Sequence, residues 1–159
     1  MSGHRAPAAG VPALRIEAYF AGRTRAWGLF EDRFGRVRQQ FTADITGTWD
    51  GRVLVLEEDF LYADGATQRR VWRIARTGEG TYEGRADDVV GVASGRGAGN
   101  ALAWRYTMDL AVGAARWRVA FDDRMVLLPD GVLLNRAHLS RWGLRIGTAS
   151  LVFRPADGR

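Results

Sequence analysis

The sequence contains no cysteine among its 159 residues. This absence excludes disulfides, thiolate zinc sites and cysteine nucleophiles, and it leaves no evidence for an oxidising compartment. Lysine is absent too, so all 23 basic residues are arginine. Because arginine stays protonated where lysine would titrate, the pI of about 10.6 overstates the basicity of a chain whose net charge at pH 7 is +5.

Long apolar runs are missing as well, so no membrane-spanning segment is predicted. The segment Met1 to Ala13 lacks the continuous apolar stretch of a signal peptide, so we expect a flexible lead-in and a cytoplasmic location. Basic and acidic residues are mixed along the whole chain. Since nucleic-acid surfaces need clustered charge, no nucleic-acid partner is predicted. The densest group of arginines is Arg23, Arg25, Arg33, Arg36 and Arg38.

Glycine, with 20 residues, is far more frequent than proline, with 4, and much of it falls in turn signals. Asp50-Gly51, Asp64-Gly65 and Asp130-Gly131 are Asp-Gly pairs, the strongest short signal for a hairpin. The segments between the turns are short and rich in β-branched and aromatic residues. The sequence therefore predicts many sequential hairpins, and not the alternating helices of βαβ units.

Apolar residues in these segments recur at every second position. Trp104, Tyr106 and Met108 share one face, and Trp117 and Phe121 share another. One apolar face per strand predicts an antiparallel sheet with a single buried side, and closing such a meander removes its exposed edges. We therefore predict an all-β protein with a single antiparallel up-and-down β-barrel of about ten strands.

The predicted barrel domain covers residues 14–154, with a lead-in at 1–13 and a C-terminal tail at 155–159. Within it, the segment Trp27 to Phe34 fits either a strand or a turn of helix. A sandwich is the alternative architecture. The sequence specifies no oligomeric state.

The arrangement resembles the calycin group, which includes lipocalins and fatty-acid-binding proteins. Gly47-Thr48-Trp49 is similar to the Gly-x-Trp of that group, and Arg145 or Arg154 is the candidate for the late arginine that covers the indole. The resemblance implies a barrel that holds one small ligand.

The chain from Leu14 to Arg154 also resembles an uncharacterised bacterial family, described only as a domain of unknown function, whose members are often lipoproteins. Those members are often encoded beside fatty-acid-modifying enzymes, so the resemblance implies a lipid ligand. This chain has no lipid-attachment cysteine. The resemblance rests on the segments Phe20–Gly28, Asp32–Gly35, Trp72–Ile74, Tyr82–Val89, Gly99–Tyr106 and Leu134–Ala137.

Several polar residues interrupt the apolar faces, where an unpaired buried polar group would be costly. Glu58, Asp88, Asn100, Asn135 and Gln39 occupy such positions. A largely apolar pocket with a few polar groups is the usual composition of a ligand site. For each residue the alternative is a cap, a bulge contact or an ion pair with an arginine. The predicted ligand-binding residues are Trp72, Trp104, Tyr106, Asn100, Asn135, Arg70 and Trp117.

The sequence shows no established catalytic or cofactor motif. The histidines are His4, in the lead-in, and His138, whose parity places it opposite Asn135. A haem held by a single histidine is conceivable, but no metal-ligand spacing, nucleophile elbow or phosphate-binding glycine motif is present. We predict no metal and no cofactor. Glu58 and Asp88 are weak candidates for catalytic carboxyls.

Three functions remain open, and binding is favoured over catalysis. The first is a binding or carrier protein for a small hydrophobic ligand, such as a fatty acid or modified lipid, with Arg70 or Arg76 receiving a carboxylate. The second is a lipid-modifying isomerase, hydratase or hydrolase that uses Glu58 or Asp88. The third is a scaffold whose barrel is filled by its own side chains.

Overall fold

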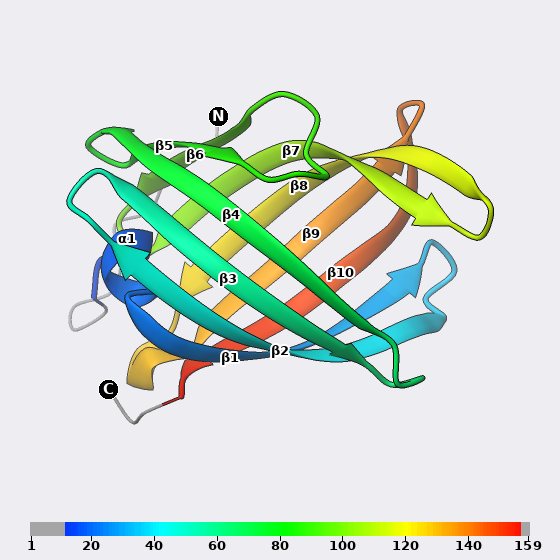
Figure 1. Ribbon diagram of the computed structural model, residues 1–159, viewed down its shortest axis with the longest axis horizontal. Helices are drawn as coiled ribbons and strands as arrows, with labels where there is room; N and C mark the ends of the chain where they lie inside the picture. Colours follow the sequence, from blue (N-terminus) through cyan, green and yellow to red (C-terminus); the bar gives the residue numbers. More distant parts are fainter. Residues whose placement is uncertain (1–11, 157–159) are drawn as a thin grey trace.

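The structure, a computed structural model, describes residues 12–156 and consists almost entirely of β-strands (Figure 1). A short helix, α1 (Ile16–Tyr19), precedes the first strand, and a 3-10 turn (Pro129–Gly131) separates β8 from β9. The strands are β1 (Gly22–Asp32), β2 (Val37–Trp49), β3 (Val53–Tyr62), β4 (Thr67–Gly78), β5 (Thr81–Arg85), β6 (Ala93–Ala98), β7 (Ala101–Val112), β8 (Ala115–Leu127), β9 (Leu133–Arg141) and β10 (Leu144–Pro155).

The ten strands form one closed barrel in which each strand pairs with the next and β10 pairs with β1. All these pairings are antiparallel, which confirms the predicted all-β, up-and-down barrel. The uncertain segment from Trp27 is a strand as far as Asp32. There the Asp32 carboxylate accepts hydrogen bonds from the backbone N–H groups of Phe34 and Arg36, at 2.9 and 3.1 Å, and turns the chain into β2.

Two of the three predicted Asp-Gly turns join β2 to β3 and β3 to β4, and Asp130-Gly131 lies in the 3-10 turn between β8 and β9. The Asp50 carboxylate accepts hydrogen bonds from the backbone N–H groups of Arg52 and Val53, at 2.8 and 2.7 Å. Gly51 follows Asp50 with a φ of +99°, a conformation that glycine adopts without steric cost. Hydrogen bonds between residues close in the sequence therefore determine these hairpins.

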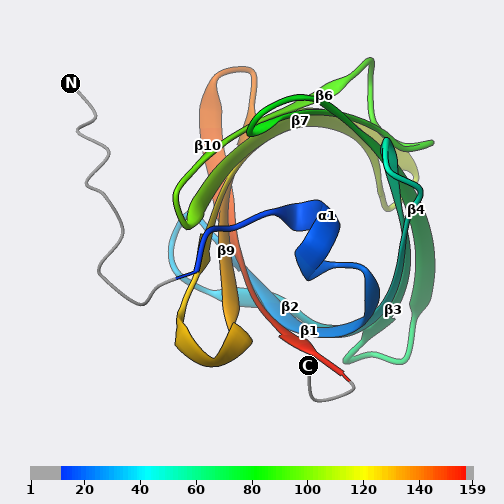
Figure 2. The same cartoon turned by 90° about the vertical axis from the view of Figure 1, so that its left-hand side faces the viewer.

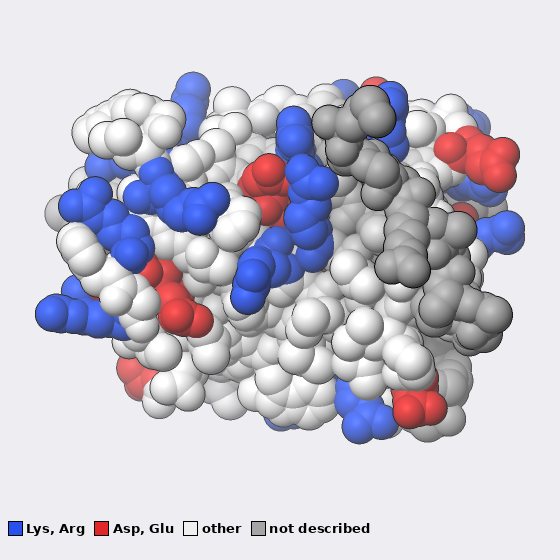
Figure 3. Space-filling model, turned by 180° about the vertical axis from the view of Figure 1, so that it is seen from behind, with Lys and Arg blue, Asp and Glu red and all other residues white. Residues whose placement is uncertain are grey.

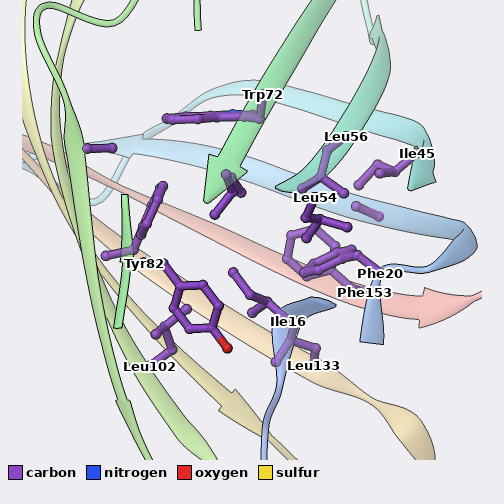
Figure 4. Close-up of a cluster of buried hydrophobic side chains, with 14 of the residues drawn as sticks. Ile16, Phe20, Ile45, Leu54, Leu56, Trp72, Tyr82, Leu102, Leu133 and Phe153 are labelled. Atoms are coloured by element: carbon purple, nitrogen blue, oxygen red, sulfur yellow. The ribbon is translucent and has the colours of Figure 1, made fainter. Parts of the chain in front are cut away.

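Helix α1 closes one end of the barrel (Figure 2). Ile16 and Phe20 are buried there, and the Phe20 ring packs edge-on against that of Phe153 at 5.5 Å. The Tyr82 hydroxyl of β5 donates a 2.6 Å hydrogen bond to the buried Glu17 carboxylate, which ties the helix to the wall. The surrounding core includes Ile45, Leu54, Leu56, Leu102 and Leu133 (Figure 4).

Gly47 of β2 lets the helix seat closely against the barrel wall. A Cβ atom at this position would overlap the backbone carbonyl of Phe20, which is part of the chain that leaves α1. The close approach of two backbones therefore requires glycine here.

The outer face mixes arginines with acidic residues (Figure 3). Several oppositely charged residues stand directly opposite each other on neighbouring strands, including Arg25 and Asp44 at 3.0 Å and Arg69 and Asp59 at 3.1 Å. Exposed pairs of this kind contribute about 0–1 kcal/mol each. Arg25, Arg69, Arg105 and Arg118 are used in such solvated cross-strand pairs.

The predicted lead-in falls largely on residues 1–11, and the tail on 157–159, which lie outside the described residues. Pro155, predicted as the first tail residue, is the last residue of β10. Within residues 12–156, no helix is long and apolar enough to cross a membrane.

Replacing Gly47 with alanine should destabilise the protein. The added methyl must push Phe20 or β2 aside, and overpacking of this kind costs about 1–3 kcal/mol. Thermal unfolding of Gly47→Ala should show a lower Tm than the parent, whereas the neighbouring exposed Thr48→Ala should change it little. An unchanged Tm for Gly47→Ala would contradict the proposed close seating of α1.

Candidate functional site

The barrel encloses a cavity of about 910 Å³ next to the core that packs around helix α1. The cavity reaches Asp64 and Ala66 of the β3–β4 turn and Gly113 of the β7–β8 turn, which lie at the end of the barrel opposite α1. Helix α1 therefore bounds the cavity at one end of the barrel, and the cavity is accessible from the opposite end. The interior is hollow, which argues against a barrel filled by its own side chains.

Aromatic rings form much of the cavity wall. The Trp72 ring meets Trp104 and Tyr106 edge-to-face, with centroids 5.6 and 5.3 Å apart, and Tyr106 stacks on Phe121 at 4.8 Å. The Trp104 indole packs directly against Gly84 and Gly95, where a Cβ atom would come within 2.7 Å of the ring. These contacts fix the rings and present a rigid apolar surface.

Glu58 of β3 places a carboxyl group in this aromatic cavity. It lines the cavity and keeps part of its surface accessible, yet within residues 12–156 no donor forms a hydrogen bond or ion pair with it. Burial raises the pKa of Glu58 to about 7, and Asp88 and Asp123 add to the rise while Arg70 opposes it. Its carboxyl group therefore changes charge near neutral pH.

Arg70 of β4 lies opposite Glu58 in the strand register, but its guanidinium is bonded elsewhere. Its Nε donates to both carboxylate oxygens of Asp88, at 3.0 and 3.2 Å, and its Nη2 donates to Asp88 Oδ2 at 2.8 Å. Asp88 belongs to the turn between β5 and β6. The pair is thus a bidentate, charge-assisted bridge that ties this turn to β4.

A second polar group joins β7, β8 and β9. The Tyr106 hydroxyl donates to Asp123 Oδ2 at 3.2 Å, and the Asn135 side-chain amide donates to the same oxygen at 3.1 Å. Within the described residues, the other carboxylate oxygen of Asp123 is buried without a hydrogen-bond partner. Burial raises the pKa of Asp123 to about 7, although both hydrogen bonds oppose the rise.

Most predicted site residues face the cavity. Those that line it are Trp72, Trp104, Tyr106, Trp117, Asn135, Arg70 and Glu58. Asn100 and Asp88 are not among the lining residues. Asn100 lies in the β6–β7 turn, where its side-chain amide donates to the carbonyl of Leu127 at 3.1 Å, and Asp88 is held by Arg70. Both residues therefore make structural contacts, which was the alternative to a place in the ligand site.

Two groups were not singled out from the sequence. Asp123 shares parity with the inward-facing Val119 and Phe121. That parity was the available signal. The Glu17–Tyr82 pair carried no local signal, since 65 positions separate its members in the sequence.

A second depression of about 690 Å³ lies over β1, β2, β3 and β10, where Trp27 and Leu61 are exposed. It contains none of the acidic groups with raised pKa values. We therefore place the candidate site in the barrel interior.

The interior offers no metal centre: within residues 12–156, no three His, Cys, Asp or Glu residues are placed to hold a metal ion. His138 is not among the cavity-lining residues, and its Nδ1 lies 3.5 Å from the Thr148 hydroxyl. The cavity is lined mainly by apolar side chains, and Glu58 could exchange a proton with a molecule held there near pH 7.

The raised pKa of Glu58 predicts that stability falls as pH rises. The folded state binds the proton more tightly than the unfolded state, whose pKa is 4.5, so stability is lost progressively between about pH 4.5 and 7. This loss should be about 3 kcal/mol. Chemical unfolding at pH 5 and pH 8 should show a smaller decrease for Glu58→Gln than for the parent.

Asp59→Asn, which alters the outward-facing neighbour on the same strand, is the matched control and should keep the parent profile. Identical pH profiles for the parent and Glu58→Gln would show that Glu58 titrates normally.

Comparison with solved structures places the barrel among known folds. The S-type phycobiliprotein lyase of Guillardia theta has a TM-score of 0.63 and 11% identity, with 90% of this chain and 91% of the lyase covered. A DUF3598 protein of unknown function from Nostoc punctiforme has a TM-score of 0.59 and 15% identity, with 91% of this chain and 50% of that chain covered. At these identities the likeness establishes a shared fold.

No functionally curated protein matches the sequence. The model of one family, described as proteins of unknown function (DUF3833), matches residues 4–155. This match confirms the resemblance to a domain family of unknown function, and the chain belongs to the DUF3833 family.

Proposed function

We propose that the protein binds a small, largely apolar molecule inside the barrel. The observation that carries the proposal is the cavity of about 910 Å³ with fixed aromatic walls and few polar groups. Pockets for small ligands usually measure roughly 300–1,000 Å³ and have this composition. A ligand that buried roughly 200 Å² of apolar surface would gain about 5 kcal/mol from the hydrophobic effect.

The separation of core and cavity also supports binding. The rings of Phe20 and Phe153 pack against each other at the helix end, whereas Trp72, Tyr106 and Phe121 pack on one another and also line the cavity. An apolar surface maintained without a partner of its own is costly, and an apolar ligand would remove that cost. A lipid, as the family resemblance implies, has the required chemistry.

Binding can be measured with Nile red, an uncharged dye whose fluorescence rises in apolar surroundings. The parent protein should enhance its emission, and bound dye should quench Trp72, Trp104 and Trp117, which line the cavity. Ala149→Phe, which adds a ring to the cavity lining, should weaken Nile red binding at least tenfold.

The control is Ala120→Phe, which adds the same ring at an exposed position of β8. It should bind like the parent. If both variants bind Nile red as the parent does, or if the parent gives no enhancement, the dye does not occupy the interior and the proposal fails.

A second candidate is catalysis on the bound molecule. The observation that favours it is the Glu58 carboxyl, whose pKa of about 7 suits a general acid or base and which faces the cavity. The shared barrel of the phycobiliprotein lyase is compatible with an enzyme on this fold. Parent protein incubated with a lipid extract of its host should then alter a lipid detected by mass spectrometry. Glu58→Gln should abolish that change and keep Nile red binding.

A further inference from the structure

The cavity holds more acidic than basic groups. Glu58 and Asp123 line it, Asp88 stands beside it, and Arg70 is the guanidinium that faces them. Arg70 is already bonded to Asp88 through two of its nitrogens. In the Tyr106–Asp123–Asn135 group, Asp123 Oδ2 accepts two hydrogen bonds, while Asp123 Oδ1 and Asn135 Oδ1 are buried. Arg38, at the rim, pairs with Asp32 at 2.8 Å. Among the carboxyl groups that line the cavity within residues 12–156, Glu58 is thus the one without a hydrogen bond or ion pair of its own.

A carboxylate accepts hydrogen bonds and donates none. A ligand carboxylate beside Glu58 would place two like charges in an environment that screens them poorly. A donor in the same place would satisfy Glu58 and recover part of its desolvation cost.

The aromatic walls favour the same class of ligand. Trp72, Trp104 and Tyr106 line the cavity, and the faces of aromatic rings carry negative electrostatic potential. Such faces attract a cation, and Arg70 already stacks over Phe60 in this way, with its guanidinium carbon 5.4 Å from the ring centroid. Carboxyl and rings together form surroundings suited to a positively charged nitrogen.

We propose that the ligand is an apolar molecule whose polar group is a hydrogen-bond-donating nitrogen, with a protonated amine the best fit, and that Glu58 receives this group. The proposal rests on the proposed binding function and narrows it. It disfavours a free fatty acid bound through Arg70, because Asp88 occupies that guanidinium. A lipid modified to carry an amine fits both the walls and the carboxyl.

The test compares three ten-carbon probes that differ only at the polar end: decylamine, decan-1-ol and decanoate. Each displaces Nile red from the parent protein at pH 8, where the amine is protonated and Glu58 is largely ionised. Decylamine should bind at least tenfold more tightly than decanoate, with decan-1-ol between them. Equal or tighter binding of decanoate overturns the proposal.

Substitution of Glu58 tests whether this residue causes the preference for decylamine over decanoate. Glu58→Gln should reduce the ratio of decylamine to decanoate affinity at least fivefold and leave decan-1-ol affinity within about twofold. Glu57→Gln is the matched control, since Glu57 is the preceding residue and its carboxylate pairs with Arg69 on the outer face. A ratio that is unchanged in Glu58→Gln, or changed equally in Glu57→Gln, assigns the preference to another group and overturns the role of Glu58.

A reciprocal variant tests the role of Asp88. Asp88→Asn removes the counter-charge of Arg70, so decanoate should gain affinity while decylamine loses it. Failure of this inference differs from failure of the proposed function: if no probe displaces Nile red, or the dye does not bind, the binding function fails. If the dye binds and decanoate is preferred, only the donor assignment fails.

Discussion

The pairing of β1 with β10 is the constraint on which the rest of the structure depends. Residues from opposite ends of the chain meet in this ladder, from Thr24 opposite Pro155 to Asp32 opposite Gly147. Without it the meander would be an open sheet with two unpaired edges, and its apolar face would have nothing to enclose. Closure converts that face into an interior, and the wall is wide enough that side chains leave a cavity. The carboxyls and rings of the candidate site face one another only because the sheet closes.

One part of the interior is a packed core that stabilises the fold, and the other part is the cavity that forms the candidate site. At the helix end, Phe20, Phe153 and their neighbours fill the space, and the buried Glu17–Tyr82 hydrogen bond fixes α1 to the wall. Toward the other end, Arg70 and Asp123 are bonded to specific partners, whereas Glu58 forms no hydrogen bond or ion pair within the described residues. The Arg70–Asp88 bridge is therefore better understood as the support of the β5–β6 turn than as a ligand contact. The proposed specificity then rests on the acidic group that is left unpaired, and not on the number of charges in the cavity.

Strand parity predicted much of this site because side chains on a strand alternate strictly between two faces. It placed Trp72, Trp104, Tyr106 and Asn135 in the interior correctly. It failed for Asn100 and Asp88, which lie in turns, where alternation does not apply. Asp123 was not singled out from the sequence, although strand parity places it on the same face as the buried Val119. The partners of Arg70 and Glu17 could not be predicted, because contacts between distant segments depend on the shear and closure of the whole barrel.

Helix α1 makes the barrel a cup and not a tube. A molecule in the cavity must leave by the same opening through which it entered, and a second molecule cannot push it out from behind. Exchange should therefore be limited by spontaneous release, with a rate that does not depend on the concentration of the competitor. A partner that receives the ligand has to approach the turns at the open end, where Asp64 and Gly113 lie.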